Sequence, residues 1–284
     1  MTVAVTGASG QLGRLVVEAL LGREAGPVVA VVRDPGKVAD FAERGVQIRQ
    51  ADYGDPAALD RALEGVDRVL LVSGNEFGAR VEQHANVVRA AERAGVQLLA
   101  YTSIPAAEGN PIILAQEHRA TEELLTRSTV PYVLLRNSWY WENYLDAAAS
   151  AVESGVLYGS AGGGVVSAAA RADYAEAAAV VLTSEGHAGR SYELGGDEPL
   201  TMTDLARVIS EVAGTSVRYQ DLPRNEYAEV LEKAGMPADF ASVYADSDTG
   251  IGAGWLEVTG GDLQKLIGRP STPVAEVLRA GIAG

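Results

Sequence analysis

The stretch Val3-Ala4-Val5-Thr6-Gly7-Ala8-Ser9-Gly10-Gln11-Leu12-Gly13 decides the fold. An apolar run typical of a buried strand leads into a glycine-rich turn, and apolar residues at helical spacing follow. Gly7 permits a tight turn, Gly10 lets backbone approach a phosphate, and Gly13 lets the helix pack closely on the strand. The spacing Gly-x-x-Gly-x-x-Gly in this context predicts a dinucleotide-binding unit with the pyrophosphate at the helix N-terminus.

The composition excludes several classes of function. The chain of 284 residues has 23 Lys and Arg against 38 Asp and Glu, which gives a formal net charge of −15. This charge argues against a nucleic-acid backbone or an anionic membrane surface as partner. The chain has no cysteine, so disulfides, thiolate nucleophiles and cysteine-ligated metals are excluded. The first strand leaves no room for a signal peptide, and no run is long enough to span a membrane. We expect a soluble, cytoplasmic protein.

Apolar runs alternate with helical segments through the first half, as a parallel sheet covered by helices on both faces requires. Further strands are expected over residues 28–32, 46–49, 68–72, 97–102 and 132–136. The pairs Asp34-Pro35 and Asp55-Pro56 predict helix starts, because aspartate caps a helix and proline fits its first turn. Helices are also expected over residues 81–94 and 114–125.

The rhythm changes after residue 137, where helices over 173–182, 203–213 and 225–234 and strands over 191–194 and 217–220 are expected. We therefore predict an α/β fold with a Rossmann-like, doubly wound parallel sheet and a smaller C-terminal α/β lobe. Residues 1–137 would form the NADP-binding domain, with elements at about 173–194 adding to it. Residues 138–284 would mostly form a substrate-binding lobe, built on the same sheet and covering the carboxyl ends of its strands.

Arg33 ends the second expected strand, about 20 residues beyond Gly13, where the dinucleotide ribose is usually recognised. Its planar, permanently charged guanidinium matches a 2′-phosphate and so favours NADPH over NADH. Asp34 follows and offers the acid expected for NAD, but as the cap before Pro35 it has a structural explanation. The sequence thus predicts NADP(H) as cofactor.

Polar residues follow the other strands. Asp52 is placed either to accept from the adenine amino group or to cap the next turn, and the sequence leaves both open. The small residues of Ser73-Gly74-Asn75 let backbone approach the ribose and nicotinamide. The candidate cofactor-binding residues from this reasoning are Gly7, Gly10, Arg33, Asp52, Ser73, Gly74, Asn75, Thr102 and Asn137.

Several segments resemble the NmrA-like group of atypical short-chain reductases, and within it the bacterial NADPH:quinone oxidoreductases of type 2. The matching segments run over nearly the whole chain, at residues 6–13, 31–35, 50–55, 101–103, 134–137, 139–140, 142–145, 171–174 and 245–248. The glycine motif alone indicates only a superfamily. The segment over 134–145 is much more specific.

The resemblance implies a reductase that binds NADPH and passes a hydride to a quinone without a flavin. It also implies cofactor contacts from the whole glycine-rich turn, which comprises Gly7, Ala8, Ser9, Gly10, Gln11 and Leu12. Further contacts are implied for Arg33 and Ser73, and for the loop residues Asn137, Ser138, Trp139, Tyr140 and Glu142. A related triphenylmethane-dye reductase shares the framework, and some relatives are redox sensors that bind NADP without catalysis. These two functions are the alternatives to a quinone reductase.

The chain departs from ordinary short-chain dehydrogenases, which carry Tyr-x-x-x-Lys after the fifth strand. Here the stretch is Gln116-Glu117-His118-Arg119-Ala120-Thr121-Glu122, with His118 where the lysine would stand, as in the quinone reductases it resembles. Carbonyl reduction forms an alkoxide that needs a positioned acid, whereas hydride addition to a quinone gives a much less basic, delocalised anion. The departure therefore argues against alcohol and ketone substrates.

No catalytic side chain is assigned. His118 and Tyr140 are the two candidates, and a buried core histidine bonded to backbone is the preferred interpretation of His118. Trp139, Tyr140, Trp141 and Tyr144 either line a slot for a flat acceptor or bury the joint between lobes, with Trp141 expected at the surface. The three histidines are scattered, so no metal site is expected. The sequence is compatible with a homodimer.

Overall fold

The computed structural model describes residues 1–282 and divides into two compact units. The first unit comprises Met1–Ile104, Glu117–Asn137 and Arg171–Tyr192. The second comprises Pro105–Gln116, Ser138–Ala170 and the chain from Glu193 onward. Positions 283–284, the end of the expected second lobe, lie outside the described residues.

The central sheet has seven strands in the order β3-β2-β1-β4-β5-β6-β9. These strands are β1 (Val3–Thr6), β2 (Val28–Val32), β3 (Gln47–Gln50), β4 (Arg68–Leu71), β5 (Leu98–Ser103), β6 (Tyr132–Asn137) and β9 (Ser191–Leu194). The pairs from β3 through β6 are all parallel. The order in which strands are added to the sheet reverses between β1 and β4, because β2 and β3 lie on one side of β1 and β4, β5 and β6 lie on the other. Folds of this kind bind nucleotides at that point. The predicted Rossmann-like α/β fold is confirmed.

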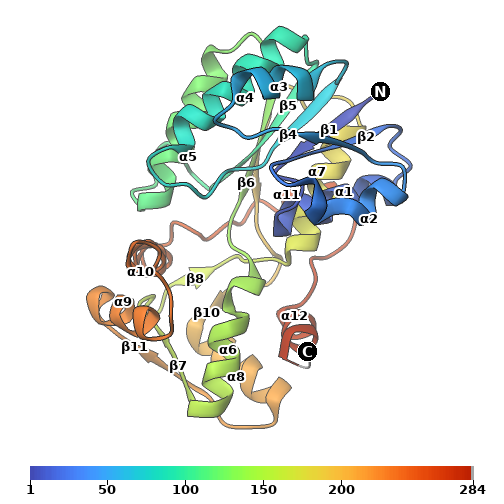
Figure 1. Ribbon diagram of the computed structural model, residues 1–284. Helices are drawn as coiled ribbons and strands as arrows, with labels where there is room; N and C mark the ends of the chain where they lie inside the picture. The colour runs from blue at the N-terminus through green and yellow to red at the C-terminus, as the bar shows by residue number, and fades with distance from the viewer. Residues whose placement is uncertain (283–284) are drawn as a thin grey trace. The chain divides into compact units, whose positions relative to one another are not determined.

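Helices cover both faces of this sheet. In Figure 1, α3 (Pro56–Leu63), α4 (Arg80–Ala94) and α5 (Ile113–Arg127) lie on one face, and α1 (Gln11–Gly22) and α7 (Arg171–Thr183) on the other. A short 3₁₀ turn, η1 (Pro35–Val38), leads into α2 (Ala39–Glu43). The two predicted helix starts are confirmed, since Asp34 accepts from Gly36 N at 2.9 Å and Asp55 accepts from Ala58 N at 3.0 Å.

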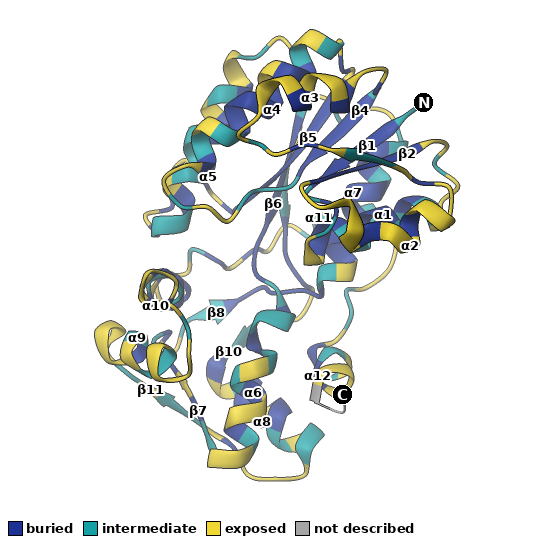
Figure 2. Ribbon diagram, in the orientation of Figure 1, coloured by how far each residue is buried: buried dark blue, intermediate teal, exposed yellow. Residues whose placement is uncertain are grey.

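The core of the sheet explains its continuous apolar runs. Every residue of β1, β2, β4 and β5 is buried, whereas the edge strand β3 has exposed residues at both ends. Figure 2 shows the central strands in the colour of buried residues and the outer faces of the helices as exposed. Helices on both faces remove water from both sides of the sheet, so the inner strands need apolar residues at successive positions.

The second unit contains two separate two-stranded sheets. In one, β7 (Val156–Gly159) pairs in parallel with β11 (Arg218–Asp221), and in the other β8 (Val165–Val166) pairs antiparallel with β10 (Leu200–Thr201). The expectation that this lobe builds on the main sheet is therefore wrong. The reason is that β9 takes the position beside β6, so the strands between them in the sequence pair elsewhere.

The helices of the second unit are η2 (Trp141–Tyr144), α6 (Leu145–Ser154), α8 (Met202–Ala213), α9 (Arg224–Lys233), α10 (Ala238–Gly252), α11 (Asp262–Ile267) and α12 (Val274–Ile282). The predictions for α8 and α9 hold to within one or two residues. By contrast, α10 was not predicted, because it buries the polar residues Ser247 and Asp248 and shows no clear apolar stripe. Within residues 1–282, no helix combines the length and apolarity needed to cross a bilayer.

The start of α1 lies directly against the turn that precedes it. A Cβ added to Gly13 would lie 2.3 Å from the carbonyl oxygen of Gly7 and 2.9 Å from the Cα of Ala8. Gly7 itself has a φ of +60°, a conformation that favours glycine. Both glycines are therefore fixed by sterics, and they place the first turn of α1 at the end of β1.

We expect Gly13→Ala to destabilise the protein by at least about 2 kcal/mol, because the methyl group meets backbone that has no room to move aside. Gly22→Ala is the matched control, since it lies in the same helix and a Cβ added there would have nothing within 4 Å. That variant should stay within about 1 kcal/mol of the wild type. Urea unfolding of both variants measures this, and equal stability would contradict the steric account.

Candidate functional site

Most of the expected cofactor residues lie at the carboxyl edge of the parallel sheet, where successive strands end. The glycine-rich turn over residues 7–12 follows β1, and Arg33, Asp52 and the segment Ser73–Asn75 follow β2, β3 and β4, while Thr102 and Asn137 lie at the ends of β5 and β6. The ends of parallel strands share one edge, so the fold brings these residues of the first unit to one side of the sheet. Ser138, Trp139, Tyr140 and Glu142 belong to the second unit.

The N-terminus of α1 has the features of an anion site. Its cap residue, Gly10, supplies no side-chain hydrogen bond, and the first turn contains no acidic residue. By contrast, α3 and α8 are capped by the side chains of Asp55 and Thr201. The amide of Gly10 donates to Gly7 O at 2.9 Å and closes the turn. The first-turn amides and the positive end of the helix dipole thus fit a pyrophosphate.

Tyr53 ties the ends of β1 and β4 together. Its hydroxyl lies 2.5 Å from Thr6 Oγ1 and donates to Val72 O at 2.9 Å, while Val72 N donates to Thr6 Oγ1 at 3.2 Å. Burial raises the pKa of Tyr53, so the hydroxyl keeps its proton and can donate. No local sequence pattern predicts this role for Tyr53.

The segment after β4 is held by two buried side chains. Ser73 N donates to Thr102 Oγ1 at 2.9 Å, and Gly74 N donates to His84 Nε2 at 3.0 Å. His84 Nδ1 lies 2.9 Å from Thr121 Oγ1, which itself donates to Glu117 O at 2.9 Å. Because Gly74 N can only donate, Nε2 of His84 accepts and Nδ1 carries the proton.

His84 is kept neutral by its surroundings. It is fully buried, and burial together with the nearby positive charge of Arg80 lowers its pKa to about 3. A neutral ring can accept from Gly74 N at any ordinary pH, so the segment after β4 has a fixed position. These bonds give His84 a structural role, and its contact with a candidate cofactor segment was not predicted from the sequence.

Arg33 lies at the end of β2 with its side chain largely in solvent. Its Nη1 is 2.8 Å from Glu76 Oε1, on the loop between β4 and α4. The interpretation of Asp34 as a helix cap is confirmed by its bond from Gly36 N. Asp52 caps its turn in the same way, accepting from Gly54 N at 2.7 Å. Glu76 was not among the residues singled out from the sequence.

His118 lies on α5 and is buried, as expected. Its partner is a side chain rather than backbone, since Nδ1 is 2.8 Å from the hydroxyl of Tyr101. Burial lowers the pKa of His118 well below its ordinary value, with the positive charge of Arg80 adding to the effect. His118 is therefore neutral near pH 7. A buried ion pair of 2.5 Å between Glu122 and Arg136 joins the same helix to β6.

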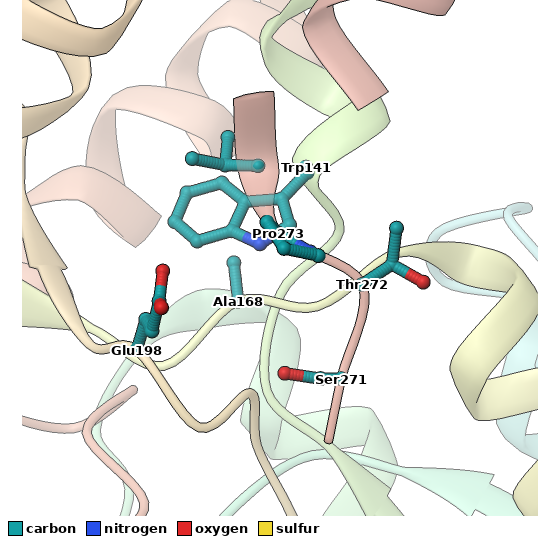
Figure 3. A pocket seen from close by; sticks show the side chains of 7 residues that line it. Trp141, Ala168, Glu198, Ser271, Thr272 and Pro273 are labelled. Carbon is teal, nitrogen blue, oxygen red and sulfur yellow. The ribbon is translucent and has the colours of Figure 1, made fainter. Parts of the chain in front are cut away.

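The aromatic segment of the second unit is packed rather than open. Trp139 is 8% exposed and its ring lies 5.8 Å from that of Tyr244. The expectation that Trp141 lies at the surface is wrong, since it is 3% exposed. Figure 3 shows its indole beside Pro273, in a small hollow also lined by Ala168, Glu198 and Ser271. Contacts with residues more than a hundred positions away cannot be predicted from local sequence patterns.

A buried carboxyl lies in the same unit. Asp248 on α10 is 5% exposed and accepts from Ser160 N at 2.9 Å. Burial raises its pKa to about 7. Among the described residues, no group of three or more His, Cys, Asp or Glu side chains is arranged to hold a metal ion.

The chain is similar to known proteins over most of its length. Residues 7–185 match the NAD(P)H-binding family. The chain is 48% identical over 275 residues to quinone oxidoreductase 2 of Escherichia coli (strain K12), covering 96% of each chain.

Several solved structures resemble nearly the whole chain, and among them are two complexes with the cofactor. One is the NADPH-dependent quinone oxidoreductase QOR2 of Escherichia coli complexed with NADPH, with a TM-score of 0.95 and 47% identity over 98% of this chain and 99% of that one. The other is the Citrobacter sp. triphenylmethane reductase complexed with NADP(H), with a TM-score of 0.93 and 40% identity over 98% of this chain and 99% of that one.

The raised pKa of Asp248 predicts a pH-dependent stability. The folded state binds this proton more tightly than the unfolded chain, whose aspartate titrates near pH 4. The resulting stability is complete below about pH 4 and is lost as the pH rises through about 7. Asp248→Asn has no charge to bury, so it should not lose this stability as the pH rises. We expect the melting temperature of the variant minus that of the wild type to be at least about 3 °C greater at about pH 8 than at about pH 5.

Differential scanning fluorimetry across this pH range measures the effect. Asp239→Asn on the same helix is the control, because Asp239 is exposed and should show no such trend. A constant difference between wild type and Asp248→Asn at every pH would contradict the assignment.

Proposed function

The chain belongs to the NAD(P)H-binding family, and from this premise we propose that it is an NADPH-dependent oxidoreductase that transfers a hydride to a quinone without a flavin. One observation carries the proposal, which is the 48% identity to quinone oxidoreductase 2 over 96% of both chains. The family match over residues 7–185 spans the glycine-rich turn, the strand ends and the aromatic segment together. The substrate class in this proposal is a small planar molecule.

In this proposal the first unit holds the cofactor. The uncapped N-terminus of α1 and the turn over residues 7–12 bind the pyrophosphate, and Arg33 binds the 2′-phosphate. Asp52 lies at the adenine end, and Ser73, Gly74, Asn75, Thr102 and Asn137 lie toward the ribose and nicotinamide. Further cofactor contacts are proposed for Ser138, Trp139, Tyr140 and Glu142. The geometry of the α1 terminus and the bonds that fix Ser73 and Gly74 support these roles.

When bound, the cofactor supplies the hydride. Unlike a ketone reductase, the chain needs no positioned acid, because the hydroquinone anion is aromatic, delocalised and weakly basic. A proton can come from solvent, so the residues need chiefly to hold donor and acceptor together and exclude water. The neutral His118, bonded to Tyr101, suits a structural role better than that of an acid.

The proposal is tested by following NADPH oxidation with a panel of quinones, a triphenylmethane dye and no acceptor, each repeated with NADH. We expect turnover with quinones, and faster turnover with NADPH than with NADH. Preference for the dye would assign the chain to the reaction named for the Citrobacter relative. Cofactor binding without turnover of any acceptor would overturn the enzymatic proposal in favour of an NADP-binding sensor.

Arg33→Ala should weaken NADPH binding by about 10- to 100-fold, since a charge-assisted contact to phosphate contributes about 1.5–3 kcal/mol. NADH lacks the 2′-phosphate, so its affinity should change by less than about threefold. Isothermal titration of both dinucleotides measures this. Equal losses for the two would refute the assignment of the 2′-phosphate to Arg33.

His118→Gln should retain quinone turnover within about threefold of wild type, whereas loss of a general acid costs about 100-fold or more. The glutamine keeps a polar group near Tyr101 and limits the damage to packing. Melting temperatures show whether the variant is folded at the assay temperature. A folded variant with a loss of two orders of magnitude in kcat would show that His118 is catalytic.

A further inference from the structure

Arg33, the residue proposed to bind the 2′-phosphate, already has an acidic partner. Its Nη1 lies 2.8 Å from Oε1 of Glu76, and the two side chains are 66% and 48% exposed. The two residues are 43 positions apart, one after β2 and the other on the loop between β4 and α4. A carboxylate thus lies on the guanidinium that a phosphate would use.

We propose that Glu76 is a specificity-determining residue that occupies Arg33 until a 2′-phosphate displaces it. The inference rests on the proposed binding of NADPH through Arg33. It adds that the affinity for phosphorylated over unphosphorylated dinucleotides is set by a competition between two anions for one guanidinium.

The ion pair between Arg33 and Glu76 can open without loss of local structure, because other hydrogen bonds hold both residues. Its second oxygen, Oε2, accepts from Gln83 Nε2 at 2.7 Å. Its backbone carbonyl accepts from Arg80 N at 2.9 Å at the start of α4. On the other side, the carbonyl of Arg33 accepts from Gln50 Nε2 at 2.9 Å. Both backbones therefore stay in place when the ion pair opens, and only two side-chain ends have to move.

The energetics favour exchange in one direction. An ion pair between two solvent-exposed side chains is weak, because water screens it and both chains lose rotamer freedom. A 2′-phosphate carries more charge than a carboxylate and accepts two parallel bonds from a guanidinium fork. The phosphate therefore displaces Glu76, and the carboxylate keeps its bond to Gln83. A dinucleotide without the phosphate leaves the ion pair closed.

The consequence is opposite to that of a purely structural ion pair. Removing the Glu76 charge frees Arg33, so NADPH should bind more tightly while NADH is unaffected. A structural role would instead lower the affinity for both dinucleotides. The predicted gain equals the strength of the ion pair that no longer has to be broken, which for an exposed pair corresponds to about 1.5- to 5-fold in affinity.

The test is isothermal titration of wild type, Glu76→Gln and Arg33→Ala/Glu76→Gln with NADPH, NADH, 2′,5′-ADP and 5′-AMP. Glu82→Gln is the matched control, because Glu82 is an exposed acid on α4 that pairs with Arg89 at 2.7 Å. We expect Glu76→Gln to bind NADPH and 2′,5′-ADP about 1.5- to 5-fold more tightly, with NADH and 5′-AMP unchanged. Glu82→Gln should show no selective gain, and the gain of Glu76→Gln should vanish in the double variant.

Failure of this inference is distinct from failure of the proposed function. Unchanged or weaker NADPH binding by Glu76→Gln, while Arg33→Ala still loses NADPH selectively, would overturn the competition alone. An equal gain for all four ligands, or the same gain in Glu82→Gln, would also overturn it, since that result is a general charge effect. No selective loss of NADPH in Arg33→Ala would instead overturn the 2′-phosphate assignment on which the inference rests.

Discussion

The close approach of α1 to the turn after β1 is the constraint on which the rest of the structure depends. With only 2.3 Å between a hypothetical Cβ of Gly13 and Gly7 O, the helix can adopt this position only because residue 13 has no side chain. That contact sets where α1 begins, and so where its first-turn amides lie relative to the end of β1. Since β4 is the neighbour of β1, the same contact also places those amides beside the segment that follows β4.

Buried polar groups fix the strand ends that surround the N-terminus of α1. Tyr53 bonds to the ends of β1 and β4, while Thr102 and His84 accept from the amides of Ser73 and Gly74. Buried polar networks of this kind are stable when every member has a hydrogen-bond partner. Burial keeps two members in the form that makes these bonds, because it holds Tyr53 protonated and His84 neutral. The bonds that Tyr53 and His84 make at the ends of β1 and β4 are thus insensitive to pH over the ordinary range.

The sequence predicted the elements whose cause is local. The strands of the inner sheet were predicted because helices on both faces impose continuous apolar runs, and the starts at Asp34 and Asp55 because capping needs residues only two or three positions apart. The pairing of β7 with β11 joins segments some sixty residues apart and has no local signal. Two further contacts were not predicted, because each joins residues far apart in the sequence. They are the burial of Trp141 beside Pro273 and the pairing of Arg33 with Glu76. Resemblance to the NmrA-like reductases, by contrast, is a pattern spread over the whole chain, and the comparisons confirm it.

An acidic protein that binds an anionic cofactor has to overcome the repulsion between like charges at the binding site. The net charge of −15 repels anions at long range, yet salt screens that repulsion over about 8–10 Å. Recognition of phosphate therefore depends on groups in direct contact, which in the proposed binding mode are backbone amides at the N-terminus of α1 and the guanidinium of Arg33. A guanidinium on such a surface attracts a carboxylate when no phosphate is present, and Glu76 is that carboxylate. The acidity of the surface thus makes competition at Arg33 a natural way to separate the two dinucleotides.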